Sequence, residues 1–356
     1  MSSEKNIPVS IIFSVFINAY RYALLIIPVF LWMPGSAVIG QETHNSQFYF
    51  NPLNLNPSLT GHFDGDWRAS VTYRNQWRSI AVPYNTGSVS FDRQFYLYSQ
   101  KISGGLLYVN DVSGDISLKV NKLYFSGAYH YTINDHELHI GIQPGVVMKS
   151  INYDKLTFPD QFDMGSGTYN GTLPTGENGD GERLTYIDLN VGITWNTRIG
   201  IFEPEAGAGL LHLNSPKESF YNNDNRKPLQ TVMHAKLKTN IGEELFVEPA
   251  LFMMAGRKAS DMIIGARAGI QTISSATSIR EVHAGIFVRN GIGLNTDAFI
   301  VNIGMIRRNL QLGISYDLNV SPLSEASGSR GAFELTLIYQ SISTILNSYS
   351  IPCERF

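Results

Sequence analysis

The sequence predicts an all-β protein, specifically a transmembrane antiparallel β-barrel of about 14 strands. The first observation behind this prediction is the alternation in residues 186–195, YIDLNVGITW, where every second side chain is apolar. Successive side chains of a strand point to opposite faces, so this segment has one apolar and one polar face. The second observation is that the pattern recurs to the end of the chain. The third is a charged content of 16%, against roughly 25% in typical soluble domains. A closed barrel in lipid accounts for all three.

Strand-length stretches of this kind recur along most of the chain. We expect strands at residues 67–77, 86–97, 101–110, 119–132, 138–149, 184–196, 199–213, 229–241, 244–256, 261–273, 279–290, 297–307, 310–320 and 331–341. Each is near the length that crosses a bilayer at a tilt. Strand ends are hard to place from one sequence, so the expected range is roughly 12 to 16 strands.

The lengths of the connections support the barrel. Odd-numbered connections include the long ones, at residues 150–183, 214–229 and 321–330, while even-numbered ones such as 133–137 and 241–243 are brief and polar. In a barrel whose amino end is periplasmic, odd connections are external loops and even ones are inner turns. The long and the short connections therefore fall on opposite sides of the membrane, as expected of a barrel with both termini in the periplasm.

Residues 1–40 have the organisation of a secretory signal peptide. Lys5 and Arg21 precede an apolar core at residues 22–33, and small residues follow before Gln41. The alternative is an uncleaved membrane anchor, which the interruptions at Arg21 and Pro28 make short. No second apolar run of that length exists in the sequence, so membrane residence of the mature chain would depend on strands.

Residues 41–66 precede the first expected strand and contain two Asn-Pro steps, Asn51-Pro52 and Asn56-Pro57. Proline removes a backbone donor and restricts the residue before it, which argues against a central strand. We therefore expect a periplasmic leader with an irregular or short-helical conformation that caps the barrel. A C-terminal tail, residues 342–356, is also expected in the periplasm.

The inward faces of the expected strands carry ions of both signs. They include Arg68, Arg74, Arg267, Arg289, Asp188, Asp317 and Glu334. An unpaired buried charge is costly, so we expect these groups to pair with each other or with water across the lumen. The alternative is that some of them bind a passing or plugging polypeptide.

No catalytic, cofactor or metal site is expected. His136 and His139, in the sequence HELH, fall on opposite faces of a strand. We therefore expect a pair of turn residues and not a zinc site, which would need more ligands close by. The oxygen-rich segments 177–182 and 221–225 lack the spacing of a known calcium loop and are expected as external loops. The scattered histidines His130, His212 and His234 do not select a hydrolase site with a serine and an acid.

Charge and cysteine content restrict the partners. A net charge of −3 and a pI near 6.2 give no basic surface for nucleic acid. The single cysteine, Cys353, excludes an internal disulfide and a cysteine-rich metal site. It leaves open a free thiol or an intermolecular contact.

Four segments together resemble the PorP/SprF family of outer-membrane proteins of the type IX secretion system of the Bacteroidota. They are NPLNLNPSLTG at residues 51–61, YRNQW at 73–77, LGISYDLNVSPLSEASGSRGAFELTLIY at 312–339 and the terminal IPCERF. The residues of these motifs expected to have structural or partner-binding roles are Asn51, Pro52, Asn56, Pro57, Gly61, Tyr73, Arg74, Gln76, Trp77, Tyr316, Asp317 and Glu334.

The resemblance implies a non-catalytic outer-membrane barrel, surrounded by outer-membrane lipid, that acts in export or surface attachment of secreted proteins. The implied partners are other type IX components, including periplasmic lipoproteins, and the C-terminal domains of secreted cargo or adhesins, which in gliding species serve motility. Two other hypotheses remain open. One is a diffusion channel or transporter for small solutes. The other is a soluble β-sandwich adhesin, which requires the apolar faces to point inward.

Overall fold

The computed structural model describes residues 45–76, 82–98, 100–113, 118–151, 158–174, 183–220, 224–256, 260–272, 278–291, 296–321 and 328–344. The expected signal peptide, Trp77, the acidic segment 177–182, residues 221–223 and Cys353 lie outside these ranges. Within them, no helix has both the length and the apolar character needed to cross a membrane.

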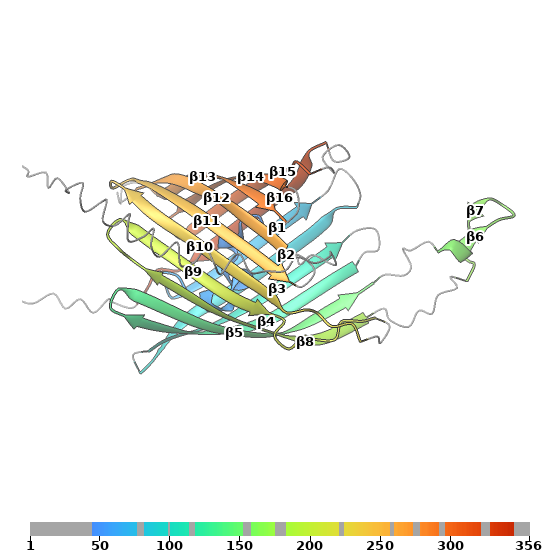
Figure 1. The fold of residues 1–356 in the computed structure, drawn as a ribbon, viewed down its shortest axis with the longest axis horizontal. Coiled ribbons are helices and arrows are strands. Elements are labelled where there is room, and N and C mark those ends of the chain that lie inside the picture. Colours follow the sequence, from blue (N-terminus) through green and yellow to red (C-terminus); the bar gives the residue numbers. More distant parts are fainter. Residues whose placement is uncertain are drawn as a thin grey trace, which may run out of the picture. The chain divides into compact units, whose positions relative to one another are not determined.

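Fourteen strands form a closed antiparallel barrel (Figure 1). They are β1 (Trp67–Gln76), β2 (Tyr84–Leu97), β3 (Gln100–Ser113), β4 (Leu118–Ile133), β5 (His136–Ser150), β8 (Arg183–Thr197), β9 (Phe202–Leu211), β10 (Gln230–Ile241), β11 (Leu245–Gly256), β12 (Ser260–Gln271), β13 (Ile279–Asn290), β14 (Thr296–Arg307), β15 (Leu310–Asn319) and β16 (Arg330–Gln340). Each strand pairs with the next one along the chain, and β16 pairs with β1 to close the barrel. The predicted fold class and strand number are confirmed.

The alternation of side chains places apolar groups on the outside. In β8, Ile187 and Ile193 are 68% and 44% exposed, while Asp188 and Thr194 between them are buried. The same arrangement holds along β16, where Leu335 and Leu337 face outward. Exposed apolar side chains over a whole barrel are stable in lipid and not in water. The soluble β-sandwich hypothesis, which needs an inward apolar face, is therefore wrong.

The longest connections all lie at one rim of the barrel. Tight turns follow β4, β10 and β14, and they use positive φ angles at Asn134 (55°), Gly242 (69°) and Arg308 (52°), as short hairpins require. We call the end of the barrel with these turns the short-turn rim and the opposite end the long-loop rim. The connection between β5 and β8 contains η4 (Pro159–Gln161) and a separate hairpin of β6 (Phe162–Asp163) and β7 (Thr168–Tyr169).

The segment before β1 lies inside the barrel. Residues 45–63, which we call the plug, contain η1 (Phe48–Phe50), α2 (Pro52–Leu55) and η2 (Pro57–Leu59). The short-helical conformation agrees with the sequence analysis, but the expected position as a periplasmic cap does not. The plug is buried against inward-facing side chains of the strands.

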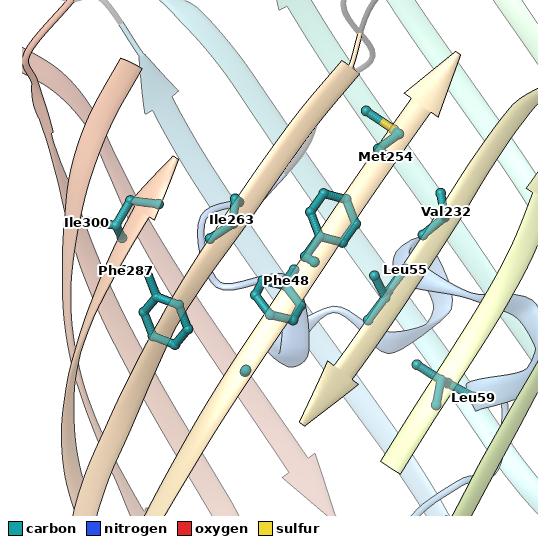
Figure 2. Close-up of a cluster of buried hydrophobic side chains, with 10 residues drawn as sticks. Phe48, Leu55, Leu59, Val232, Met254, Ile263, Phe287 and Ile300 are labelled. Carbon is teal, nitrogen blue, oxygen red and sulfur yellow. The ribbon is translucent and has the colours of Figure 1, made fainter. Parts of the chain in front are cut away.

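An apolar sector of the inner wall explains this position. Figure 2 shows Phe48, Leu55 and Leu59 of the plug packed with buried wall side chains. Those wall residues are Val232, Ala250, Phe252, Met254, Ile263, Phe287 and Ile300. In an empty barrel they would face water, so covering them with the plug is favourable by about 25 cal/mol for each Å² of apolar surface buried.

Candidate functional site

The start of the plug is held by a buried group of charges that we call the anchor network. Arg74 Nη1 lies 3.1 Å from Glu334 Oε2, and Arg74 Nη2 lies 2.9 Å from Asp317 Oδ2. Arg289 Nη1 is also 2.9 Å from Asp317 Oδ2. Ser46 of the plug lies among them, and its Oγ is 2.6 Å from a nitrogen of each arginine and 2.7 Å from Asp317 Oδ1. Two positive and two negative side chains therefore neutralise each other's charge in a site that is buried from water.

Backbone amides of the plug complete this network. The amides of Ser46 and Gln47 donate to the two carboxylate oxygens of Glu334, at 2.8 and 3.1 Å. Arg74 on β1 and Glu334 on β16 are register partners across the strand pair that closes the barrel. The expectation that inward ions pair with each other is confirmed here, and the same groups also bind a polypeptide segment of the chain itself.

A second ion pair holds the end of the plug. The guanidinium of Arg68 meets Asp92 through two hydrogen bonds, Nη2 to Oδ2 at 2.6 Å and Nε to Oδ1 at 3.0 Å. The Gly61 amide donates to the same Asp92 Oδ2 at 2.7 Å, and Arg68 Nη2 donates to the Leu59 carbonyl at 3.1 Å. The plug is thus attached to the wall at both of its ends by charge-assisted hydrogen bonds.

The Asn-Pro steps supply the attachments between these ends. Asn56 Nδ2 donates to the backbone carbonyls of Ile193 and Ala208, at 3.3 and 3.1 Å. Its Oδ1 accepts from the Ser58 amide at 3.1 Å and so caps η2. Asn51 Nδ2 donates to Ser88 Oγ of β2 at 2.9 Å. Pro52 and Pro57 each stand in the first turn of a short helix, where the missing amide hydrogen costs nothing.

Glycines on the wall allow the plug to approach closely. A Cβ added at Gly141 of β5 would lie 2.3 Å from the Pro57 carbonyl carbon, and one added at Gly192 of β8 would lie 1.8 Å from Asn56 Oδ1. Both distances are shorter than any real contact. The wall at these positions has room for the plug only because the side chains are absent.

Valine at Gly192 is therefore expected to displace the middle of the plug. We expect a loss of stability of about 1–3 kcal/mol from overpacking and faster proteolysis within residues 45–63, measured by limited digestion and mass spectrometry. The matched control is Gly87→Val, since a Cβ at Gly87 on β2 meets no atom within 4 Å. Equal digestion of the two variants would contradict the proposed close fit.

The structure brings most of the predicted motif residues together. Asn51, Pro52, Asn56, Pro57 and Gly61 lie in the plug, and Arg74, Asp317 and Glu334 lie in the anchor network. Other motif residues lie apart. Tyr73 and Tyr316 point outward, Gln76 is half-buried at the end of β1, and Trp77 lies outside the described residues. Ser46 and Asp92 were missed, although Asp92 could have been found as the inward residue opposite Arg68 on β2.

A small cavity remains beside the plug. It has a volume of about 50 Å³ and is bordered by Asn45, Asn51 and Asn54 of the plug and by Lys122 and Tyr124 of β4. That volume accommodates a few water molecules and no large solute. Burial raises the pKa of the Tyr49 hydroxyl in the plug, so that group stays neutral.

These features define an integral outer-membrane type of β-barrel, with lipid-facing strands and a segment of its own chain in the lumen. Within that class, the chain belongs to the family described as type IX secretion system membrane protein PorP/SprF, whose model matches residues 37–339. The match confirms the resemblance seen in the sequence motifs.

Solved barrels are similar in fold. The toluene transporter TbuX of Ralstonia pickettii is 12% identical, with a TM-score of 0.49, and the match covers 87% of this chain and 96% of that one. The monoaromatic hydrocarbon channel CymD is 9% identical, with a TM-score of 0.49 and coverages of 83% and 93%. BamA of Haemophilus ducreyi, lacking POTRA domains 1–3, is 7% identical, with a TM-score of 0.42 and coverages of 77% and 70%. No curated protein matches the chain.

Proposed function

We propose that this protein is a non-catalytic component of the type IX secretion system that takes part in the export or surface attachment of secreted proteins, including adhesins. The observation that carries the proposal is the family match over residues 37–339. The plug supports a scaffolding role over a diffusion channel for small solutes, because it occupies part of the lumen and is attached to the wall along its length.

In this proposal the two rims have different partners. The long-loop rim faces the cell exterior and contacts the exported protein, while the short-turn rim contacts periplasmic lipoproteins of the system. The short turns support this orientation, since outer-membrane barrels have short periplasmic turns and longer external loops. The start of β1 and the end of β16 meet at the short-turn rim. Asp66 N and Trp67 N donate to Ser341 Oγ, at 3.0 and 2.9 Å. Hydrogen bonds from Thr344 lower the pKa of Asp66, so this contact retains a charged carboxylate.

Deletion of the gene in its own host is expected to remove secreted or surface-displayed proteins, measured by quantitative mass spectrometry of the medium and the cell surface. Loss of one or a few proteins would indicate a partner dedicated to particular cargo, and loss of many would indicate a general component. The control is complementation with the wild-type gene. An unchanged profile would contradict the proposal and favour the small-solute channel.

A complementing variant without residues 159–169 then tests the long-loop rim. The deletion removes the β6–β7 hairpin, which forms no part of the barrel sheet. We expect the barrel to assemble and the display of cargo to fall. Full restoration by this variant would contradict a role of that loop in contacting cargo.

A further inference from the structure

A second polar cluster joins the plug to the wall near the short-turn rim. It consists of His62 at the end of the plug and of Glu137 and His139 on β5, and one ligand atom from each lies within 4.8 Å of the other two. Glu137 and His139 are two residues apart and so share the inward face of the strand. Glu137 Oε2 is 3.6 Å from His139 Nε2, and the rings of His62 and His139 have centroids 4.4 Å apart.

The second nitrogen of each histidine already has a hydrogen-bond partner. His62 Nε2 lies 2.9 Å from Glu205 Oε2, and that carboxylate is itself paired with Lys236 Nζ at 2.9 Å. His139 Nδ1 lies 2.6 Å from Nδ1 of His130. Metal-binding histidines have this arrangement, in which an outer carboxylate or similar group fixes the tautomer and the ring orientation. A cation would then bind His62 Nδ1 and His139 Nε2, and at His139 it would displace the proton that Nε2 shares with Asn196 Oδ1.

Asn196 bridges two members of the cluster. Its Oδ1 lies 2.6 Å from His139 Nε2, and its Nδ2 donates to Glu137 Oε2 at 3.2 Å. The carboxamide therefore connects the same nitrogen and oxygen that a cation between these residues would connect. The Glu137 side chain is 43% exposed, so a cation can enter from the short-turn rim without passing the plug.

We propose that His62, Glu137 and His139 form a binding site for a divalent transition-metal cation of the zinc type. Two imidazole nitrogens and one carboxylate oxygen are ligands that Zn²⁺ binds well, with a further position for water or Asn196. Calcium and magnesium prefer oxygen ligands alone. Because His62 belongs to the plug and the other two residues to β5, the bound cation fastens the end of the plug to the barrel wall. This site is additional to the proposed secretion role.

The test uses the full-length protein, purified in detergent with an affinity tag that contains no histidine and stripped of metal with EDTA. Zinc is titrated against a chromophoric chelator, and the expected result is one Zn²⁺ per chain. Replacement of zinc by cobalt is expected to give the visible absorption of a four-coordinate site. Hydrogen exchange is expected to slow at residues 58–63 when zinc is added, because the cation restrains the plug.

Two variants remove one ligand each without touching the deeply buried His139. His62→Gln and Glu137→Gln are each expected to weaken zinc binding by on the order of tenfold to 100-fold or more, since even the loss of an outer-shell partner has effects of that size. The matched control is His136→Gln. This neighbouring histidine stacks on Trp195, at 5.9 Å between ring centroids, and its loss should leave zinc binding unchanged.

Several results would overturn the proposal. They are substoichiometric binding by the wild type, wild-type affinity in both ligand variants, or a loss of binding in His136→Gln equal to theirs. If a ligand variant fails to fold, X-ray absorption at the zinc edge of the wild type decides the question. Two imidazole ligands support the site, and a shell of oxygen ligands alone contradicts it.

Discussion

Replacing Arg74 by leucine is expected to lower the free energy of unfolding by about 3–5 kcal/mol, the usual cost of removing one partner from a buried ion pair. Among the described residues, Glu334 would lose its one arginine partner and Asp317 one of two. Both carboxylates are essentially inaccessible to solvent. The measurement is urea unfolding of the barrel in lipid vesicles, followed by tryptophan fluorescence.

The control for this variant is Arg198→Leu. The Arg198 side chain is 72% exposed and pairs with Glu203 at 3.5 Å, so its loss should change stability by less than about 1 kcal/mol. The double variant Arg74→Leu, Glu334→Leu is expected to recover part of the lost stability, because no unpaired charge remains at that register position. If Arg74→Leu lowered the free energy of unfolding as little as Arg198→Leu, the anchor network would not stabilise the fold.

The strands could be predicted because their signal is local. Alternation along a segment such as residues 186–195 reports directly which side chains face lipid, and β8 extends over Arg183–Thr197 as that pattern predicts. The connection lengths then place the strand ends on two rims. Neither signal depends on knowing what lies inside the barrel.

The position of the plug could not be predicted in this way. Its Asn-Pro steps interrupt any regular period, so residues 45–63 show only that they are not a strand. The missed signal lay in the strands themselves. Ile263, Phe287 and Ile300 occupy inward positions, where an open lumen would expose them to water. An apolar sector on an otherwise polar inner wall predicts that something covers it.

The candidate metal cluster was missed for a related reason. Along the sequence, His139 has only His136 as a histidine neighbour on the same strand, and that side chain does lie on the opposite face. The residue that completes the cluster is His62, and it reaches β5 only because the plug passes through the lumen. A contact between segments so far apart in sequence has no local pattern.

Removal of the plug is expected to open the barrel. In planar bilayers the wild type should show only background current. A variant without residues 45–61, which removes all of the plug except His62 and Phe63, should conduct on the order of tenfold above that background or more, because a barrel of this size encloses a lumen. The variant should still fold, since the main wall charges pair with each other. Arg74 meets Glu334, Arg289 meets Asp317 and Arg68 meets Asp92 without help from the plug.

A disulfide between plug and wall makes the test reversible. Ser58 Oγ and Thr194 Oγ1 are 2.7 Å apart, so cysteines at these positions, with Cys353→Ser to remove the natural thiol, can link η2 to β8. Any brief current steps that the wild type shows should disappear in the oxidised double-cysteine variant and return when reductant is added. The deletion control is the variant without residues 159–169, which should stay closed.

The possible outcomes separate the two functions considered for this barrel. A wild type that conducts steadily would favour the small-solute channel, and a plug-deleted barrel that stays closed would show that other residues seal the lumen. Closure by the plug, together with a changed secretion profile on gene deletion, is the combination expected of a scaffold. With that combination of results, the plug would keep the membrane sealed, and the loops and turns would be the surfaces left to bind protein partners.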